Sequence, residues 1–130
     1  MKFSCDKAVL SAAVSNVSRA VTTRTALQAL EGILIRAEGD TLTLTGYDLE
    51  LGITTVIPAA VSEEGSIILG ARLFGEMIRK LEGGDVFVAS DDKLLTEIRG
   101  GGAEFTILGM DAADYPELPG LGDADRKSVV

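Results

Sequence analysis

The sequence predicts an α+β domain in which a unit of one strand, one helix and three strands occurs twice. Short runs of alternating apolar and polar residues, bounded by glycines and acids, are typical of half-buried strands. Two longer segments, residues 7–20 and 71–82, space their apolar residues as one face of a helix does. The order of elements repeats with a period of about 65 residues, too long for a solenoid. We therefore expect two helices side by side, packed against antiparallel sheets, with their polar faces pointing the same way.

Composition bounds the class of protein. The chain has 130 residues and is 46% hydrophobic, which suits one domain, or two small similar lobes that share a core. No apolar run approaches the roughly 20 residues that span a bilayer, and the first residues do not form a signal peptide, so we expect a cytoplasmic location without membrane contact. Cys5 is the single cysteine, and we expect it to be buried and inert.

The distribution of charge matters more than its sum. A net charge of −8 argues against nucleic acid as a partner, because phosphate binding is driven by basic groups. Residues 1–30, however, carry +3, so the rest carries −11, and residues 7–30 contain no acid. Because fields are local over a Debye length of about 10 Å, an acidic molecule with one basic face can still bind DNA.

The first unit begins with a strand over residues 2–5, followed by Asp6 as the N-cap of the helix over residues 7–20. Its apolar stripe consists of Leu10, Val14, Val17 and Val21. Its other face is polar without acids and consists of Lys7, Ser11, Ser15 and Ser18, with Arg19 beside it. A solvated helix face is the plainer interpretation of this polarity, and both interpretations stay open at this point.

A meander follows, with strands over residues 32–37, 41–50 and 51–57. We expect Leu42, Leu44 and Leu49 in the sheet core, and Gly46 and Asp48 at a tight corner. Residues 62–65 read as a turn after the strand end at Pro58.

The second unit has a strand over residues 66–69, the helix over residues 71–82 and a closing pair of glycines. The apolar side of this helix consists of Leu73, Phe74, Met77, Ile78 and Leu81, and its polar side, with a local charge of +2, of Arg72, Glu76, Arg79 and Lys80. Strands are expected over residues 85–90, 94–99 and 103–108. From residue 109 the apolar residues are scattered, which is typical of a linker, and Val129 and Val130 resemble the start of another strand. We expect the chain to be part of a longer protein.

Few residues support catalysis. The sequence contains no histidine, which excludes histidine-based triads and metal sites. Gly100, Gly101 and Gly102 join two strands instead of opening a helix, so they predict a turn and not a phosphate cradle. Asp48 and Glu50 alternate onto one strand face and could act as a carboxylate pair or hold a metal, although turn and surface acids explain them more simply. A small carboxylate-dependent hydrolase and a non-catalytic protein-interaction module are the alternative functions.

Five segments together indicate a family. They are MKF (residues 1–3), RTALQAL (24–30), LTLTGYDLE (42–50), ARLF (71–74) and DAADYPE (111–117). In this order and spacing they resemble the N-terminal domain of the bacterial DNA polymerase III beta subunit, the sliding clamp. The resemblance covers residues 1–120, which we take as the domain, and residues 121–130 are expected to start a linker to a second domain.

The resemblance implies a DNA-clamp fold and a replication processivity factor with no catalysis and no cofactor of its own. In the family, three such domains per subunit and two subunits per ring place the helices around double-stranded DNA, and the ring tethers the polymerase. The implied DNA-binding residues are Arg24 in a loop, Lys7, Ser11, Ser15 and Arg19 on the first helix, and Arg72, Arg79 and Lys80 on the second.

The resemblance also implies a subunit interface. Phe105 and Ile107 match the edge strand that closes the homodimeric ring, and Leu73 stands where some relatives carry a basic residue near that interface. In the family, polymerase and clamp loader bind mainly the third domain, which this chain lacks. We therefore expect the 130-residue chain to be monomeric or weakly self-associating, with feeble, salt-sensitive affinity for duplex DNA.

Overall fold

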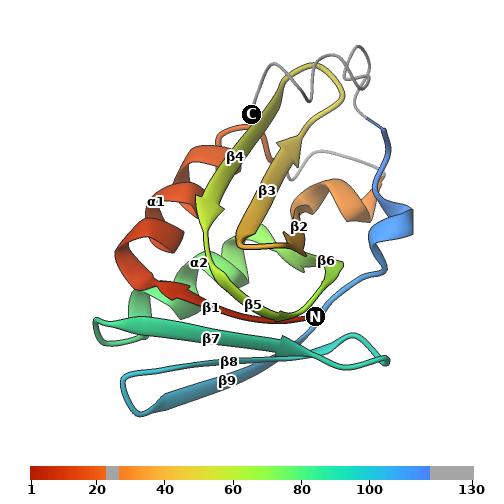
Figure 1. Ribbon diagram of the computed structural model, residues 1–130. Helices are drawn as coiled ribbons and strands as arrows, with labels where there is room; N and C mark the ends of the chain where they lie inside the picture. Colours follow the sequence, from red (N-terminus) through yellow and green to blue (C-terminus); the bar gives the residue numbers. More distant parts are fainter. Residues whose placement is uncertain (23–26, 118–130) are drawn as a thin grey trace.

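The computed structural model describes residues 1–22 and 27–117 and confirms the α+β class, with two helices and two antiparallel sheets (Figure 1). One sheet has the strand order β5-β1-β7-β8-β9 and the other β4-β3-β2-β6. The strands are β1 (Lys2–Asp6), β2 (Gly32–Glu38), β3 (Thr41–Tyr47), β4 (Gly52–Pro58), β5 (Ala60–Glu63), β6 (Gly65–Gly70), β7 (Asp85–Ser90), β8 (Leu95–Gly100) and β9 (Ala103–Leu108). The helices are α1 (Lys7–Ser18) and α2 (Ala71–Lys80), with short 3₁₀ helices η1 (Gln28–Glu31) and η2 (Ala112–Asp114).

The two sequence units exchange their first strands. β1 opens the first unit but pairs with β7 of the second, with Phe3 opposite Val88. β6 opens the second unit but pairs with β2 of the first, with Leu34 opposite Ile68. Each sheet is therefore built from both units, so the main core belongs to both and the chain does not divide into two lobes that could separate.

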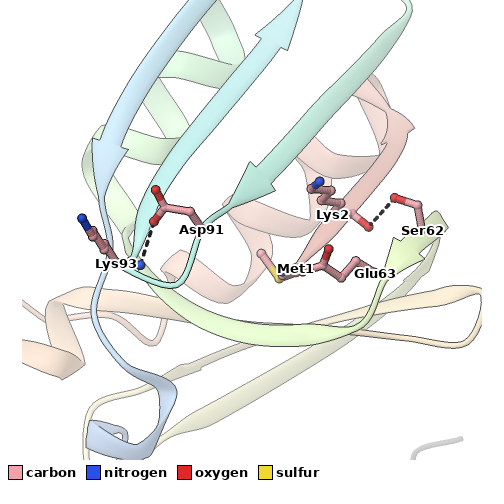
Figure 2. Close-up of polar contacts among 6 residues, drawn as sticks. All are labelled: Met1, Lys2, Ser62, Glu63, Asp91 and Lys93. Carbon is pink, nitrogen blue, oxygen red and sulfur yellow. Dashed lines mark hydrogen bonds and ion pairs between the residues drawn. The ribbon is translucent and has the colours of Figure 1, made fainter.

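The structure contains a strand, β5, where the sequence predicted only a turn over residues 62–65. β5 pairs with the edge of β1, and the Met1 amine lies 3.2 Å from Glu63 Oε1 (Figure 2). Ser62 Oγ donates to the Lys2 carbonyl at 3.4 Å. The strand is short and mostly exposed, so its pairing depends on β1 and not on a local pattern. The prediction of a turn was wrong for this reason.

Residues 109–117, predicted as linker, are packed onto the domain. Met110 forms an antiparallel bridge with Ile68 on the free edge of β6, which is the place that β5 takes on β1 in the other unit. Tyr115 is 9% exposed, and its hydroxyl donates to the Thr45 carbonyl at 3.3 Å. Tyr115 forms a second small core with Ala29, Leu30, Tyr47 and Ile68, and Met110 packs against it. The scattered apolar residues of this segment have no period, so only tertiary packing shows that they are buried.

The β3–β4 connection also differs from the prediction. β3 ends at Tyr47, and Gly46 lies inside the strand opposite Ile53 instead of at the corner. Leu49 is 51% exposed at a φ of 79° in the turn, so it does not belong to the core, whereas Leu42 and Leu44 are fully buried as expected.

Both predicted helices form, and their apolar stripes face the core. Asp6 caps α1, since its carboxylate accepts from the Val9 N–H at 3.1 Å. Phe74 and Ile78 of α2 are buried, but Leu73 is 54% exposed, so its assignment to the apolar side of that helix was wrong. The helices end two residues earlier than expected, at Ser18 and Lys80.

Cys5 is buried in the main core, as predicted. Burial, with smaller effects from Asp6 and Asp85, raises the pKa of its thiol to about 12. The thiol is therefore neutral at neutral pH, and the thiolate is the reactive form. We expect a thiol reagent at pH 8 to modify Cys5 far more slowly in the native protein than in urea, as followed by mass spectrometry. Equal rates in the two conditions would contradict this burial.

Candidate nucleic-acid interface

The two helices lie antiparallel on one side of the molecule (Figure 1). The first residue of α1, Lys7, meets Leu81 just past the end of α2, while Ser18 near the end of α1 shares a groove with Ala71 at the start of α2. The helices approach closely at Gly75, where a Cβ would lie 3.7 Å from Val14 Cγ1. An added methyl there would make only ordinary van der Waals contact, so the helices pack closely without needing a glycine.

A groove of about 410 Å³ runs between α1 and α2. It brings together five of the polar residues that the sequence placed on the two helices, namely Ser11, Ser15, Ser18, Arg72 and Arg79. Its apolar lining includes Val14 and Ile78, which belong to the main core. Two faces that are 64 positions apart in sequence thus form one surface rich in hydroxyl and guanidinium groups.

One lining residue was missed by the sequence reasoning. Glu31, at the end of η1, contributes a carboxylate to the groove. Its position depends on the 3₁₀ helix, for which residues 28–31 gave no periodic signal. This acid lies on the same groove as Arg72, so the surface is mixed in charge at that point.

Four of the predicted cations are exposed and lie at helix ends, namely Arg19, Arg72, Arg79 and Lys80. Arg79 and Lys80 occupy the last turn of α2, where positive charge is favoured by the helix dipole, and Arg19 is the C-cap of α1. Arg72 lies 3.6 Å from Glu76 Oε1, but its side chain is 89% exposed, so this pair is weak. Arg24 lies outside the described residues.

Lys7 is held differently from the other cations. Its ammonium donates to the Leu81 carbonyl, and its backbone N–H donates to the Gly84 carbonyl at 2.9 Å. The residue is half-buried. It joins the beginning of α1 to the end of α2.

The predicted interface residues lie on β9, the edge strand of the five-stranded sheet. Phe105 and Ile107 are half-buried against the main core, while Thr106 between them points to the exposed face. Leu73 is exposed on α2.

Asp48 is committed to the β3–β4 turn. Its Oδ1 accepts from the Leu51 N–H at 2.6 Å and from the Glu50 N–H at 2.9 Å. These backbone hydrogen bonds, that of Leu51 first, lower the pKa of the carboxyl. Within residues 1–22 and 27–117, no group of three or more cysteines and acids could hold a metal ion. The turn explains Asp48, so the hydrolase interpretation is not favoured.

The interlocked sheets with a paired-helix face define a DNA-clamp domain. The chain belongs to the family of the DNA polymerase III beta subunit, N-terminal domain, whose model matches residues 1–119.

Known relatives of similar sequence agree with this family assignment. The chain is 39% identical over 127 residues to the beta sliding clamp of Bacillus subtilis (strain 168), covering 92% of this chain and 34% of that protein. It is 37% identical over 129 residues to the beta sliding clamp of Halalkalibacterium halodurans, covering 93% of this chain and 34% of that protein. The chain spans about a third of the length of these relatives.

Solved structures show the same fold. The crystal structure of the DNA polymerase sliding clamp from Bacillus subtilis matches with a TM-score of 0.90 and 37% identity, covering 95% of this chain and 34% of that chain. A putative DNA polymerase III beta subunit from Eubacterium rectale matches with a TM-score of 0.89 and 40% identity, covering 94% of this chain and 33% of that chain. Of the helices in the described part of the chain, none has the length and apolar character needed to cross a membrane.

Proposed function

We propose that this chain is one domain of a sliding clamp, a ring that encircles duplex DNA and tethers the replicative polymerase without catalysing a reaction. Family membership supports the proposal, and the single observation that carries it is the groove between α1 and α2, with hydroxyls on one side and guanidinium groups on the other. We place its action in the cytoplasm, with polymerase and clamp loader as partners through the parts of the relatives that lie beyond this chain's match. The domain corresponds to residues 1–120, followed by a linker.

This surface suits sliding. A ring that moves along DNA needs diffuse positive potential and weak phosphate contacts, because base readout would hold it at one sequence. Short serine side chains such as Ser11 and Ser15 can contact phosphate directly or through water and release it quickly. The acidic remainder of the protein disfavours DNA elsewhere on its surface.

The proposed contact set follows from this arrangement. It consists of Ser11, Ser15 and Arg19 on α1 and of Arg72, Arg79 and Lys80 on α2, with Arg24 added from the family resemblance. The sequence also predicted Lys7 as a DNA contact. We leave it out of the proposed set because its ammonium donates to the Leu81 carbonyl.

The charge reversal Arg79→Glu tests the DNA-binding surface. It replaces a groove cation by an anion, so we expect affinity for a short fluorescent duplex at low salt to fall on the order of tenfold. The slope of log K against log salt should also become shallower by about 0.9 for the lost phosphate contact. Fluorescence anisotropy at several salt concentrations measures both quantities.

Arg99→Glu is the matched control. It makes the same change in net charge on β8, where the exposed Arg99 alternates with the buried Ile98 and so lies on the sheet face away from the core. Its affinity and salt slope should stay close to those of the parent protein. An equal loss in both variants would mean that net charge alone, and not the groove, governs binding.

We also propose that β9 closes the ring by pairing with another subunit. Its outer edge has no neighbouring strand among the described residues, and free edges bind other strands. Phe105 and Ile107 would anchor this contact, with Leu73 adding apolar surface from α2.

Ile107→Asp tests this interface in a chain of the relatives' full length. A charge at a half-buried interface position should shift subunits from dimer toward monomer, as measured by analytical ultracentrifugation. Thr106→Asp, on the opposite face of the same strand, is the control and should leave the dimer intact. If the Ile107 variant stays dimeric while it remains folded by circular dichroism, the interface lies elsewhere.

A further inference from the structure

We propose that Lys7 is a positioning residue that fixes α1 against α2, and that it is not itself a phosphate contact. The statement that Lys7 does not contact phosphate rests on the proposed DNA-binding function. The statement that Lys7 fixes the two helices does not depend on that function. The proposal starts from the two bonds of this residue, one from its ammonium to the Leu81 carbonyl and one from its N–H to the Gly84 carbonyl at 2.9 Å.

The electrostatics of the two helix ends favour this role. A cation in the first turn of a helix is disfavoured by the dipole of that helix, whereas a cation beside the last carbonyls of a helix is stabilised. α1 has no acid in its first turn that could pair with Lys7. Because the helices are antiparallel, the ammonium can reach the end of α2, where Leu81 is the C-cap. The favourable site for this charge is therefore on α2.

The bonds also hold the connection that follows α2. Gly84 has a φ of 94°, so residues 81–84 turn sharply between α2 and β7. Lys7 bonds to both ends of this turn, at Leu81 and Gly84. While its ammonium donates to Leu81, the side chain cannot also reach out to DNA. The half-buried position of Lys7 agrees with this restriction.

The consequence for the groove follows from the helix geometry. Gly75 and Val14 leave the helices close together at their crossing, where side-chain contacts are apolar and directionless. The two hydrogen bonds of Lys7 are directional, so they fix the orientation of α1 relative to α2 at one end of the helix pair. They thereby set how Ser11 and Ser15 stand relative to Arg79 across the groove.

The test compares four variants, at three lysines, of the 130-residue chain. Lys7→Met keeps the length and apolar stem but removes the donors. We expect its Tm to fall by roughly 5 °C. We also expect faster hydrogen exchange at the Lys7 amide and several-fold weaker binding to a short duplex at low salt. The salt slope should not change, because no phosphate contact is lost. Lys7→Arg, which restores a donor at similar reach, should recover most of the Tm.

Two controls separate position from phosphate contact. Lys80→Met removes an exposed cation at the end of α2 and should make the salt slope shallower by about 0.9 with little change in Tm. Lys2→Met, on the exposed face of β1, should change neither. A Lys7→Met slope that is shallower by about 0.9, or an unchanged Tm and exchange rate, would overturn the proposal.

The two proposals fail differently. If the parent chain and all variants bind DNA without salt dependence, the DNA-binding function is contradicted. The Tm, the exchange rates and the rescue by Lys7→Arg still decide the positioning role, because they do not involve DNA.

Discussion

Replacing Gly46 by alanine is expected to lower the free energy of unfolding by about 4 kcal/mol or more. A Cβ at this position would lie 2.1 Å from the Val17 carbonyl oxygen and 3.0 Å from its carbon. Both are backbone atoms near the end of α1, so relief requires β3 and α1 to move apart, and close-packed interiors resist such movement. Urea denaturation followed by circular dichroism measures the change, and failure to fold would be its extreme form.

Gly75→Ala is the matched control, with the same added methyl and the opposite sign. A Cβ there would lie 3.7 Å from Val14 Cγ1 and 3.9 Å from Arg79 Nη1, which is ordinary van der Waals contact. Because alanine favours the helix, we expect a gain of about 0.5–1 kcal/mol. Similar losses of unfolding free energy in both variants would show that the close contact between residue 46 and Val17 does not cause the effect.

Tyr115→Ala is expected to lower the free energy of unfolding by about 3 kcal/mol. The side chain fills the second core beside Tyr47 and Ile68, and its loss leaves a cavity there. Tyr115→Phe keeps the ring but removes the bond to the Thr45 carbonyl, so it should cost only about 1 kcal/mol. If residues 109–117 were a linker, both variants would match the parent protein in urea denaturation.

The same residue predicts a dependence on alkaline pH. Burial, and to a lesser degree Tyr47, raises the pKa of the Tyr115 phenol above its ordinary value of 10. The unfolded chain therefore releases this proton at lower pH than the native protein does, so stability should fall as pH rises above 10. Cys5 contributes a decline of the same sign. Tyr115→Phe should flatten this decline in thermal unfolding at pH 9–11, without removing the part due to Cys5.

Sequence alone predicted most of the local structure. The periods of the two helices, the N-cap at Asp6 and the alternation of strands such as β7 and β9 are local properties, and they led to correct elements. The polar helix faces could also be predicted from sequence, because residues at i, i+3 and i+4 share a face of a helix whatever its surroundings. The sequence also carried enough motifs to indicate the family that the comparisons confirm.

Other features depend on contacts between distant residues. β5 forms because β1 offers it an edge, residues 109–117 are ordered by Ile68 and Thr45, and Gly46 is required by the approach of Val17. The hydrogen bond from the Lys7 ammonium to the Leu81 carbonyl, at the end of α2, likewise joins residues 74 positions apart. Sequence by itself therefore determined which faces are polar, since that is set by period. Only the tertiary structure decided how those faces meet, since strand exchange and helix crossing bring together residues that no local pattern relates.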